Sequence, residues 1–171
     1  MIAYLNGEFK VKNPAYFIVE CNGVGYQVNI SLNTFSKLQT LDKGKIHTYL
    51  HIREDAQILY GFADESEKNL FISLISVQGV GTNMARMILS SMSPADLEEA
   101  IRTENDVLIQ RIKGVGPKTA KRLVIDLKDK IGKGAGATEN SFGFGHNTMK
   151  EEALSALAML GFTRQQGEKA I

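Results

Sequence analysis

The feature that most constrains the fold of this chain is a short glycine turn that occurs twice. Gly79-Val80-Gly81 returns as Gly114-Val115-Gly116, 35 residues later, in a chain of 171 residues. The apolar residues around the two turns recur at the same offset, pairing Leu74 with Ile109, Val77 with Ile112, Ala85 with Ala120, Ile88 with Leu123 and Leu89 with Val124. Self-similarity at a fixed period indicates a repeated structural unit. The repeat therefore predicts two copies of an apolar helix, a tight Gly-x-Gly turn and a second apolar helix.

Turns of this kind have a specific physical chemistry. Glycine permits a positive φ and a close approach of the backbone to another group. The helix that follows begins with unpaired N–H groups and the positive end of its dipole, which together form a site for a phosphate. Two such turns, in a sequence that has no P-loop motif, favour a clamp on a nucleic-acid backbone over a nucleotide site.

Positive charge is concentrated beside the second turn, although the whole chain has a formal net charge of only +1. Between residues 111 and 130, seven basic side chains stand against two acidic ones, which gives a local charge of +5. The basic residues are Arg111, Lys113, Lys118, Lys121, Arg122, Lys128 and Lys130. A charge run is commonly a solvated helix face. The position of this run after a phosphate-type turn favours contact with DNA phosphates over that alternative.

Other classes of site have little support in the composition. The single cysteine, Cys21, excludes an intrachain disulfide and a cysteine-based zinc site, and its apolar strand predicts a buried structural thiol. The three histidines, His47, His51 and His146, lack metal-ligand spacing, so we expect no metal and no cofactor. No segment is apolar enough to span a membrane and the N-terminus lacks the pattern of a signal peptide, which predicts a cytoplasmic protein.

Residues 1–63 predict a small β-barrel. Five segments alternate between apolar and polar residues or form short apolar runs, at 2–11, 15–21, 25–30, 45–52 and 57–62. Turn signals such as Asn22-Gly23 separate them. Five short strands are too few for a sandwich, so we expect a five-stranded OB-type barrel. Residues 31–38 interrupt the pattern and predict a short helix capped by Ser31 or Asn33.

From residue 64 to residue 131 the apolar period becomes helical. Five segments carry apolar residues at spacings of three and four, at 67–77, 83–92, 95–103, 106–112 and 118–131. Start signals support them, because Pro94 and Pro117 suit the first turn of a helix and Asn105 can cap the fourth. We interpret residues 64–131 as a tandem helix-hairpin-helix DNA-binding domain.

The remainder of the chain divides into a linker and a helical tail. Residues 132–147 contain five glycines and no helical period, which predicts a flexible linker. Residues 148–171 resume an amphipathic pattern, with Thr163 as a cap for a second helix, and predict a small C-terminal helical domain. Two short helices form a thin core, so this segment is marginal alone, truncated, or completed by a partner. The expected fold class is therefore α+β and multidomain.

An acidic pair, Glu54 and Asp55, lies between the fourth and fifth predicted strands, at the tip of an expected hairpin. On the residues alone, three interpretations remain open. The pair is a polar loop, or it is half of the metal site of a nuclease, for which no third carboxylate is apparent. In the third interpretation its charge repels phosphates and so discriminates between shapes of nucleic acid.

A set of motifs in one order links the barrel to the repeat. Besides the two Gly-Val-Gly turns, they are Met1-Ile2, Gly23-Val24-Gly25-Tyr26, Arg53-Glu54-Asp55-Ala56-Gln57 and Leu59-Tyr60-Gly61-Phe62. Together they resemble the RuvA family, the junction-recognition subunits of bacterial RuvA–RuvB branch-migration machines. The resemblance covers essentially the whole chain, from barrel through tandem hairpins and linker to the small helical domain.

The resemblance implies roles for individual residues. Glu54 and Asp55 would form an acidic pin at the centre of a tetramer. Contacts with DNA phosphates would come from the turns and the helical residues after them, namely Gly79, Gly81, Asn83, Gly114, Gly116, Lys118, Thr119 and Arg122. The ATPase partner would dock on Leu154, Leu157, Leu160 and Phe162. The chain departs from the family pattern at Asn83, where a basic residue is usual, and in a tail with room for two helices instead of three.

The function that the resemblance implies is that of a non-catalytic subunit in recombination and DNA repair. A homotetramer, or two tetramers around the DNA, would hold a four-way Holliday junction open and flat at the bacterial nucleoid. It would dock the hexameric RuvB ATPase, and a junction resolvase is a further expected partner. Two rivals remain: a helix-hairpin-helix nuclease or glycosylase with Glu54, Asp55 or Asp126 as catalytic groups, and a generic binder of duplex DNA.

Overall fold

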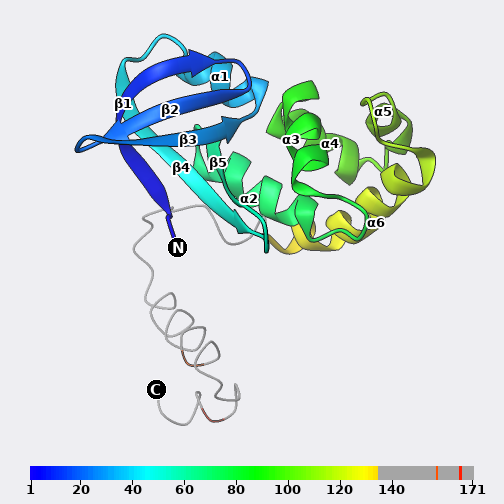
Figure 1. The fold of residues 1–171 in the computed structure, drawn as a ribbon. Helices are drawn as coiled ribbons and strands as arrows, with labels where there is room; N and C mark the ends of the chain where they lie inside the picture. The colour runs from blue at the N-terminus through cyan, green and yellow to red at the C-terminus, as the bar shows by residue number, and fades with distance from the viewer. Residues whose placement is uncertain (135–156, 158–165, 167–171) are drawn as a thin grey trace, which may run out of the picture. The chain divides into compact units, whose positions relative to one another are not determined.

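The N-terminal part of the protein is a closed β-barrel of five strands (Figure 1). The structure, a computed structural model, describes residues 1–134, 157 and 166. The strands are β1 (Tyr4–Asn13), β2 (Tyr16–Cys21), β3 (Val24–Ile30), β4 (Lys43–Ile52) and β5 (Gln57–Phe62). They follow the order β1-β2-β3-β5-β4, with β4 closing on β1; only the β3–β5 pair is parallel. The predicted OB-type barrel is confirmed.

Alternation of side chains builds the interior of this barrel. Phe17 and Val19 of β2, and Val28 of β3, are fully buried and are separated along their strands by more exposed residues. The β2–β3 connection is a two-residue turn in which Asn22 has φ +51° and Gly23 has φ +83°. Asn-Gly favours this turn because both residues tolerate positive φ, and its twist matches that of the strands.

Six helices are described, and side chains fix where most of them begin. They are α1 (Leu32–Leu38), α2 (Glu65–Ile75), α3 (Thr82–Ser91), α4 (Pro94–Arg102), α5 (Asp106–Gln110) and α6 (Pro117–Gly134). Four have a capping side chain at the preceding residue, namely Ser31, Asp64, Ser93 and Asn105. Ser31, not Asn33, caps α1. Helix α2 begins two residues before the predicted start because the Asp64 carboxylate accepts from the Glu67 amide at 2.9 Å.

The end of α6 also differs from the prediction. The helix continues to Gly134, so the first three residues of the predicted linker, 132–134, are helical. Gly132 and Gly134, on either side of Lys133, do not end the helix, because extending a helix that is already nucleated by about one turn costs little free energy. Of the predicted tail, Leu157 and Gln166 are described, both in helical conformation. Leu154, Leu160 and Phe162 lie outside the described residues. Within residues 1–134, no helix is long and apolar enough to cross a membrane.

Helix α2 joins the barrel to the other helices. It contacts β4 and β5 on one side and α3, α4 and α6 on the other (Figure 1). At the centre of the contact, the fully buried Phe71 packs against three barrel rings, with centroid distances of 5.6 Å to Tyr49, 5.1 Å to Tyr60 and 5.0 Å to Phe62. Because Tyr60 and Phe62 belong to the same buried cluster as the helical residues, barrel and hairpins share one core.

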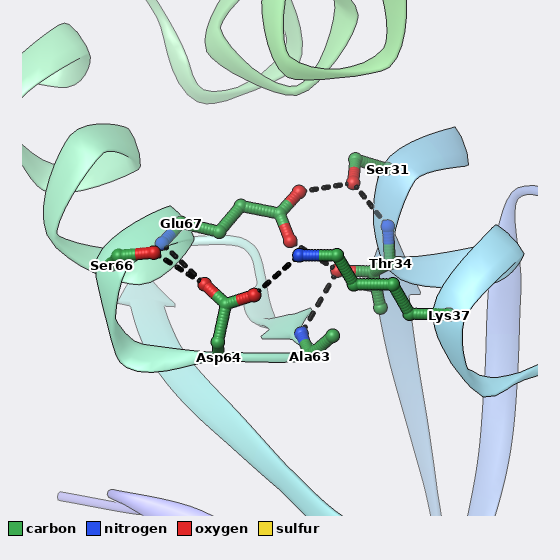
Figure 2. A network of polar contacts seen from close by, with 7 residues as sticks. All are labelled: Ser31, Thr34, Lys37, Ala63, Asp64, Ser66 and Glu67. Atoms are coloured by element: carbon green, nitrogen blue, oxygen red, sulfur yellow. Dashed lines mark hydrogen bonds and ion pairs between the residues drawn. The ribbon is translucent and has the colours of Figure 1, made fainter. Parts of the chain in front are cut away.

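A buried polar network crosses the same boundary (Figure 2). The carboxylate of Glu67 is fully buried and accepts hydrogen bonds from the hydroxyls of Ser31 and Thr34, the latter at 2.7 Å. The Thr34 hydroxyl also accepts from the Ala63 amide at 3.0 Å. Burial raises the pKa of Glu67, against the opposing effect of the two hydroxyl bonds. The network therefore holds α1, β5 and α2 together through one carboxylate.

Asp64 lies at the edge of this network (Figure 2). It accepts from the hydroxyl of Ser66 at 2.7 Å and forms an ion pair with Lys37 of α1 at 2.6 Å. Partial burial alone would raise its pKa, but the bonds from Lys37, Ser66 and the Glu67 amide outweigh burial and lower the pKa to about 2.

We expect Asp64→Asn to lower the free energy of unfolding by about 1 kcal/mol at pH 7, because the side chain is 37% exposed and solvent screening reduces the full effect of the pKa shift. Asparagine is also a good helix cap, so the variant removes the charge and keeps the cap. Between pH 4 and pH 2 the unfolded wild type binds a proton at Asp64 before the folded protein does. The wild-type advantage should therefore shrink as the pH falls through that window. Urea titrations at several pH values measure it, and a constant difference would contradict the assignment.

Candidate nucleic-acid interface

The two glycine turns have the same backbone structure. Gly79 has φ +93° and Gly114 has φ +90°, so both lie in the left-handed region that favours glycine. In each turn the middle valine donates its amide to the carbonyl three residues back, Val80 to Val77 and Val115 to Ile112, both at 3.0 Å. Those valines are buried, at 5% and 6% exposure. The repeat in the sequence is therefore a repeat in the structure, anchored by its middle residue.

The glycines themselves face open space. A Cβ added at Gly79, Gly81 or Gly116 would meet no atom within 4 Å, and one at Gly114 would meet only the Met87 methyl at 4.0 Å. Within the described part of the chain, the side of each turn on which a Cβ would lie is therefore open.

The helices after the turns lack the side-chain caps that the other helices have. Gly81 precedes α3 and makes no side-chain capping hydrogen bond. Gly116 precedes α6 and has no side chain with which to cap it. The first-turn amides of both helices, which in α6 begin at Lys118 because Pro117 has no N–H, and the positive ends of their dipoles are therefore available to an anion.

Positive charge distinguishes the second turn from the first. Lys118 and Arg122 are exposed on the first turns of α6, and Thr119 is half-buried between them. The Nε atom of Arg122 lies 3.6 Å from Asp126, a partly exposed pair of small energetic value. At the place in α3 that corresponds to Lys118 stands the exposed, neutral Asn83. The second turn thus combines amides with cations, whereas the first offers amides and a neutral side chain.

The acidic pair lies where the sequence predicted it, in the turn between β4 and β5. Glu54 and Asp55 are exposed there, and the Arg53 amide closes the turn by donating to the Ala56 carbonyl at 2.8 Å. The Arg53 guanidinium donates to Nε2 of His51 at 2.9 Å. Residues 1–134 contain no group of three histidines, cysteines or carboxylates arranged to hold a metal ion. Within that range, no third ligand accompanies the acidic pair.

One contact at this interface was not predicted. The Tyr60 hydroxyl, on β5, donates to the Thr82 hydroxyl, on the first residue of α3, at 2.9 Å. Both residues are buried, at 3% and 4% exposure. Two further bonds tie α3 to the N-terminal part of the protein: Arg86 donates to the Ala15 carbonyl between β1 and β2, and the amide of Leu32 in α1 donates to Ser90, both at 3.1 Å. The sequence does hold one sign of this contact: Thr82 differs from Pro117, its equivalent in the second repeat, and so has a hydroxyl where the second repeat has none.

Two protein families match the chain. Residues 1–61 match the family described as RuvA N terminal domain, which corresponds to the barrel. Residues 71–129 match the family described as SAM-like helix-hairpin-helix tandem, which corresponds to the two glycine turns and their helices.

Curated relatives extend the match over the chain. A protein of Christiangramia forsetii is 50% identical over 171 residues, covering 100% of this chain and 88% of its own length. One of Bacteroides thetaiotaomicron is 49% identical over 179 residues, covering 100% and 89%, and one of Cytophaga hutchinsonii is 46% identical over 173 residues, covering 99% and 87%. Each of the three is named Holliday junction branch migration complex subunit RuvA.

We expect Gly79→Ala to destabilise the protein by about 1 kcal/mol through its positive φ, and also to weaken DNA binding, because the methyl group occupies the open space over the turn. Gly23→Ala is a matched control, since Gly23 also has a positive φ and open space but lies in the β2–β3 turn. Urea titration and a DNA-binding titration of both variants separate strain from contact. Equal loss of DNA binding in the two would remove the first glycine turn from the interface.

Proposed function

The chain belongs to the RuvA family, and from that premise we propose that it binds four-way Holliday junctions as the recognition subunit of a branch migration complex in recombination and DNA repair. The observation that carries the proposal is the pair of equivalent glycine turns, each open to solvent and each followed by a helix without a side-chain cap. Because both turns share a core with Tyr60 of β5, the strand that follows the acidic pair, the three can act on one DNA molecule as a unit.

In this proposal the glycine turns bind phosphates of a junction arm. Backbone amides recognise phosphate oxygens and take no information from the bases, so recognition follows the shape of the DNA. Lys118 and Arg122 add contacts at the second turn in which donor and phosphate are both charged, whereas the amides and Asn83 at the first turn are uncharged donors. Thr119 would also act as an uncharged donor.

The acidic pair supplies discrimination. In a homotetramer, the state that we propose either as one ring or as two rings around the junction, four copies of Glu54 and Asp55 would gather at the crossover. Their charge would repel a continuous duplex passing through the centre and leave room for strands that turn away into the arms.

Motion would come from a partner. We propose that the hexameric RuvB ATPase docks on residues 148–171, through Leu154, Leu157, Leu160 and Phe162, and that a resolvase joins the larger complex in the bacterial cytoplasm. This chain would act as a non-catalytic subunit. A sequence without a P-loop motif supports a division of labour in which ATP hydrolysis belongs to the partner.

The asymmetry between the turns generates a paired prediction. Lys118→Ala should weaken junction binding and reduce the slope of log Kd against log salt by about one unit, because one phosphate contact loses its cation. Asn83→Lys, the equivalent position at the first turn, should tighten binding and raise the slope by about one unit. Titrations at four or more salt concentrations measure both. Slopes that do not change in either variant would remove these positions from the set of phosphate contacts.

The acidic pair provides the test of the function. The double variant Glu54→Gln with Asp55→Asn should tighten binding to linear duplex more than to a junction, so that the ratio of the duplex Kd to the junction Kd falls. The matched control is Glu98→Gln with Glu99→Gln on α4, which neutralises two exposed carboxylates away from the hairpin tip. Both variants gain the same net charge, so a general electrostatic gain appears in each.

The measurement compares both dissociation constants at one salt concentration. A wild type that does not prefer the junction would contradict junction recognition and support a generic duplex binder. Divalent-dependent cleavage of a labelled junction by the wild type, abolished in the acidic-pair variant, would instead support a nuclease. If the ratio falls equally in the Glu98→Gln, Glu99→Gln control, the acidic pair acts only through the net charge of the protein.

A further inference from the structure

The first glycine turn is held by the barrel through a bond that the second turn cannot form. Thr82, the first residue of α3, accepts from the Tyr60 hydroxyl at 2.9 Å. The second repeat has Pro117 at the equivalent position, 35 residues later, and proline has no hydroxyl. The contact is therefore a specific addition to one of two turns that have the same backbone structure.

The surroundings of this bond restrict its geometry. Tyr60 is 3% exposed and its ring packs against Phe71 at 5.1 Å, so the hydroxyl is carried on a side chain held by the core. Thr82 is 4% exposed and follows Gly81 directly. Loss of one partner would leave a buried hydroxyl without its hydrogen bond, so the pair strongly favours one placement of the helix start.

The same strand connects this bond to the acidic pair. β5 begins at Gln57, two residues after Asp55, and carries Tyr60 in its interior. The five residue steps from Asp55 to Tyr60 span roughly 17 Å when extended. The acidic pair and the first glycine turn are therefore the two ends of one strand-and-hydrogen-bond connection.

The accurate placement of the turn relative to a phosphate matters more for the first glycine turn than for the second. The first turn has Asn83 where the second has Lys118, so at this position it depends on hydrogen bonds from uncharged donors. Such bonds require donor–acceptor distances near 3 Å and good alignment, whereas the attraction between a cation and a phosphate falls off slowly with distance. A phosphate-binding turn without a cation at this position must therefore be placed accurately to contribute.

We propose that Tyr60 and Thr82 are positioning residues: their hydrogen bond sets the distance between the acidic pair and the first glycine turn, and thereby contributes to the preference for junctions over linear duplex. A junction arm on the first turn must leave the crossover correctly placed around the acidic pair, whereas a linear duplex has no crossover to place and is repelled by the pair. The inference rests on the proposed junction binding and adds a determinant of its specificity.

The test uses Tyr60→Phe, Thr82→Val and the double variant of the full chain. Each single variant should weaken junction binding roughly three- to tenfold, the range that one hydrogen bond spans, and change duplex binding less. The double variant should be no worse than the singles, because both singles remove the same bond. It should also recover much of the urea midpoint lost in the singles, since it leaves neither hydroxyl buried alone.

Recovery of stability without recovery of junction preference is the signature of a positioning role. Thr82→Ser keeps the hydroxyl and should restore most of the preference, and Tyr26→Phe on β3 controls for loss of a tyrosine hydroxyl elsewhere in the barrel. If the double variant regains the wild-type ratio of duplex Kd to junction Kd together with its stability, the bond is structural only and the proposal is wrong. If the wild type shows no preference for junctions, the proposed function and this inference both fail. If the wild type prefers junctions and Tyr60→Phe leaves the ratio of duplex Kd to junction Kd unchanged, the inference fails and the proposed function stands.

Discussion

The docking of α2 against the barrel is the interaction on which the rest of the structure depends. Phe71 fills the space between the rings of Tyr60 and Phe62, and one turn earlier Glu67 brings a carboxylate into the same boundary. A buried carboxylate is costly unless its oxygens are hydrogen-bonded. The hydroxyls of Ser31 and Thr34 supply those bonds only when α1 and α2 are in place. Apolar packing supplies the buried surface between α2 and the barrel, and the polar network selects one arrangement of α1, α2 and the barrel.

This single arrangement gives weak contacts their value. Backbone amides at a glycine turn are uncharged donors, and each hydrogen bond that one forms with phosphate is modest in net free energy. They contribute when the protein has already ordered them, because binding then costs little conformational entropy. The core that runs from the barrel to α6 supplies that order for both turns. The first turn has the additional Tyr60–Thr82 bond, whereas the second has the charge of Lys118 and Arg122. In the proposed binding of phosphate, the first turn therefore depends more on accurate placement and the second more on positive charge.

Local patterns predicted the elements well, and the exceptions have physical causes. The five strands, the Asn22-Gly23 turn and the glycine turns at Gly79 and Gly114 are confirmed. Predictions of helix ends were less accurate. Helix α2 begins earlier in the chain than predicted because Asp64 caps it, and α6 continues to Gly134 through residues whose composition predicted a linker. Propensity is a weak guide at the end of a long helix, where each added residue extends a structure that already exists. The acidic pair is at the predicted hairpin tip, and its role stays a prediction.

The sequence by itself determined the repeat, the positive φ at its glycines, the alternation that closes a barrel and the charge that gathers at the second turn, because each depends on residues close together in the chain. Tertiary structure alone decided that Glu67 is buried beside Ser31 and Thr34, residues 36 and 33 positions away, and that Tyr60 meets Thr82, 22 positions away. Neither pairing leaves a periodic signal, since a hydroxyl or a carboxylate at one position is compatible with solvent as well as with a partner. The choice is made by packing, when the docking of α2 removes these groups from water and leaves them one another as partners.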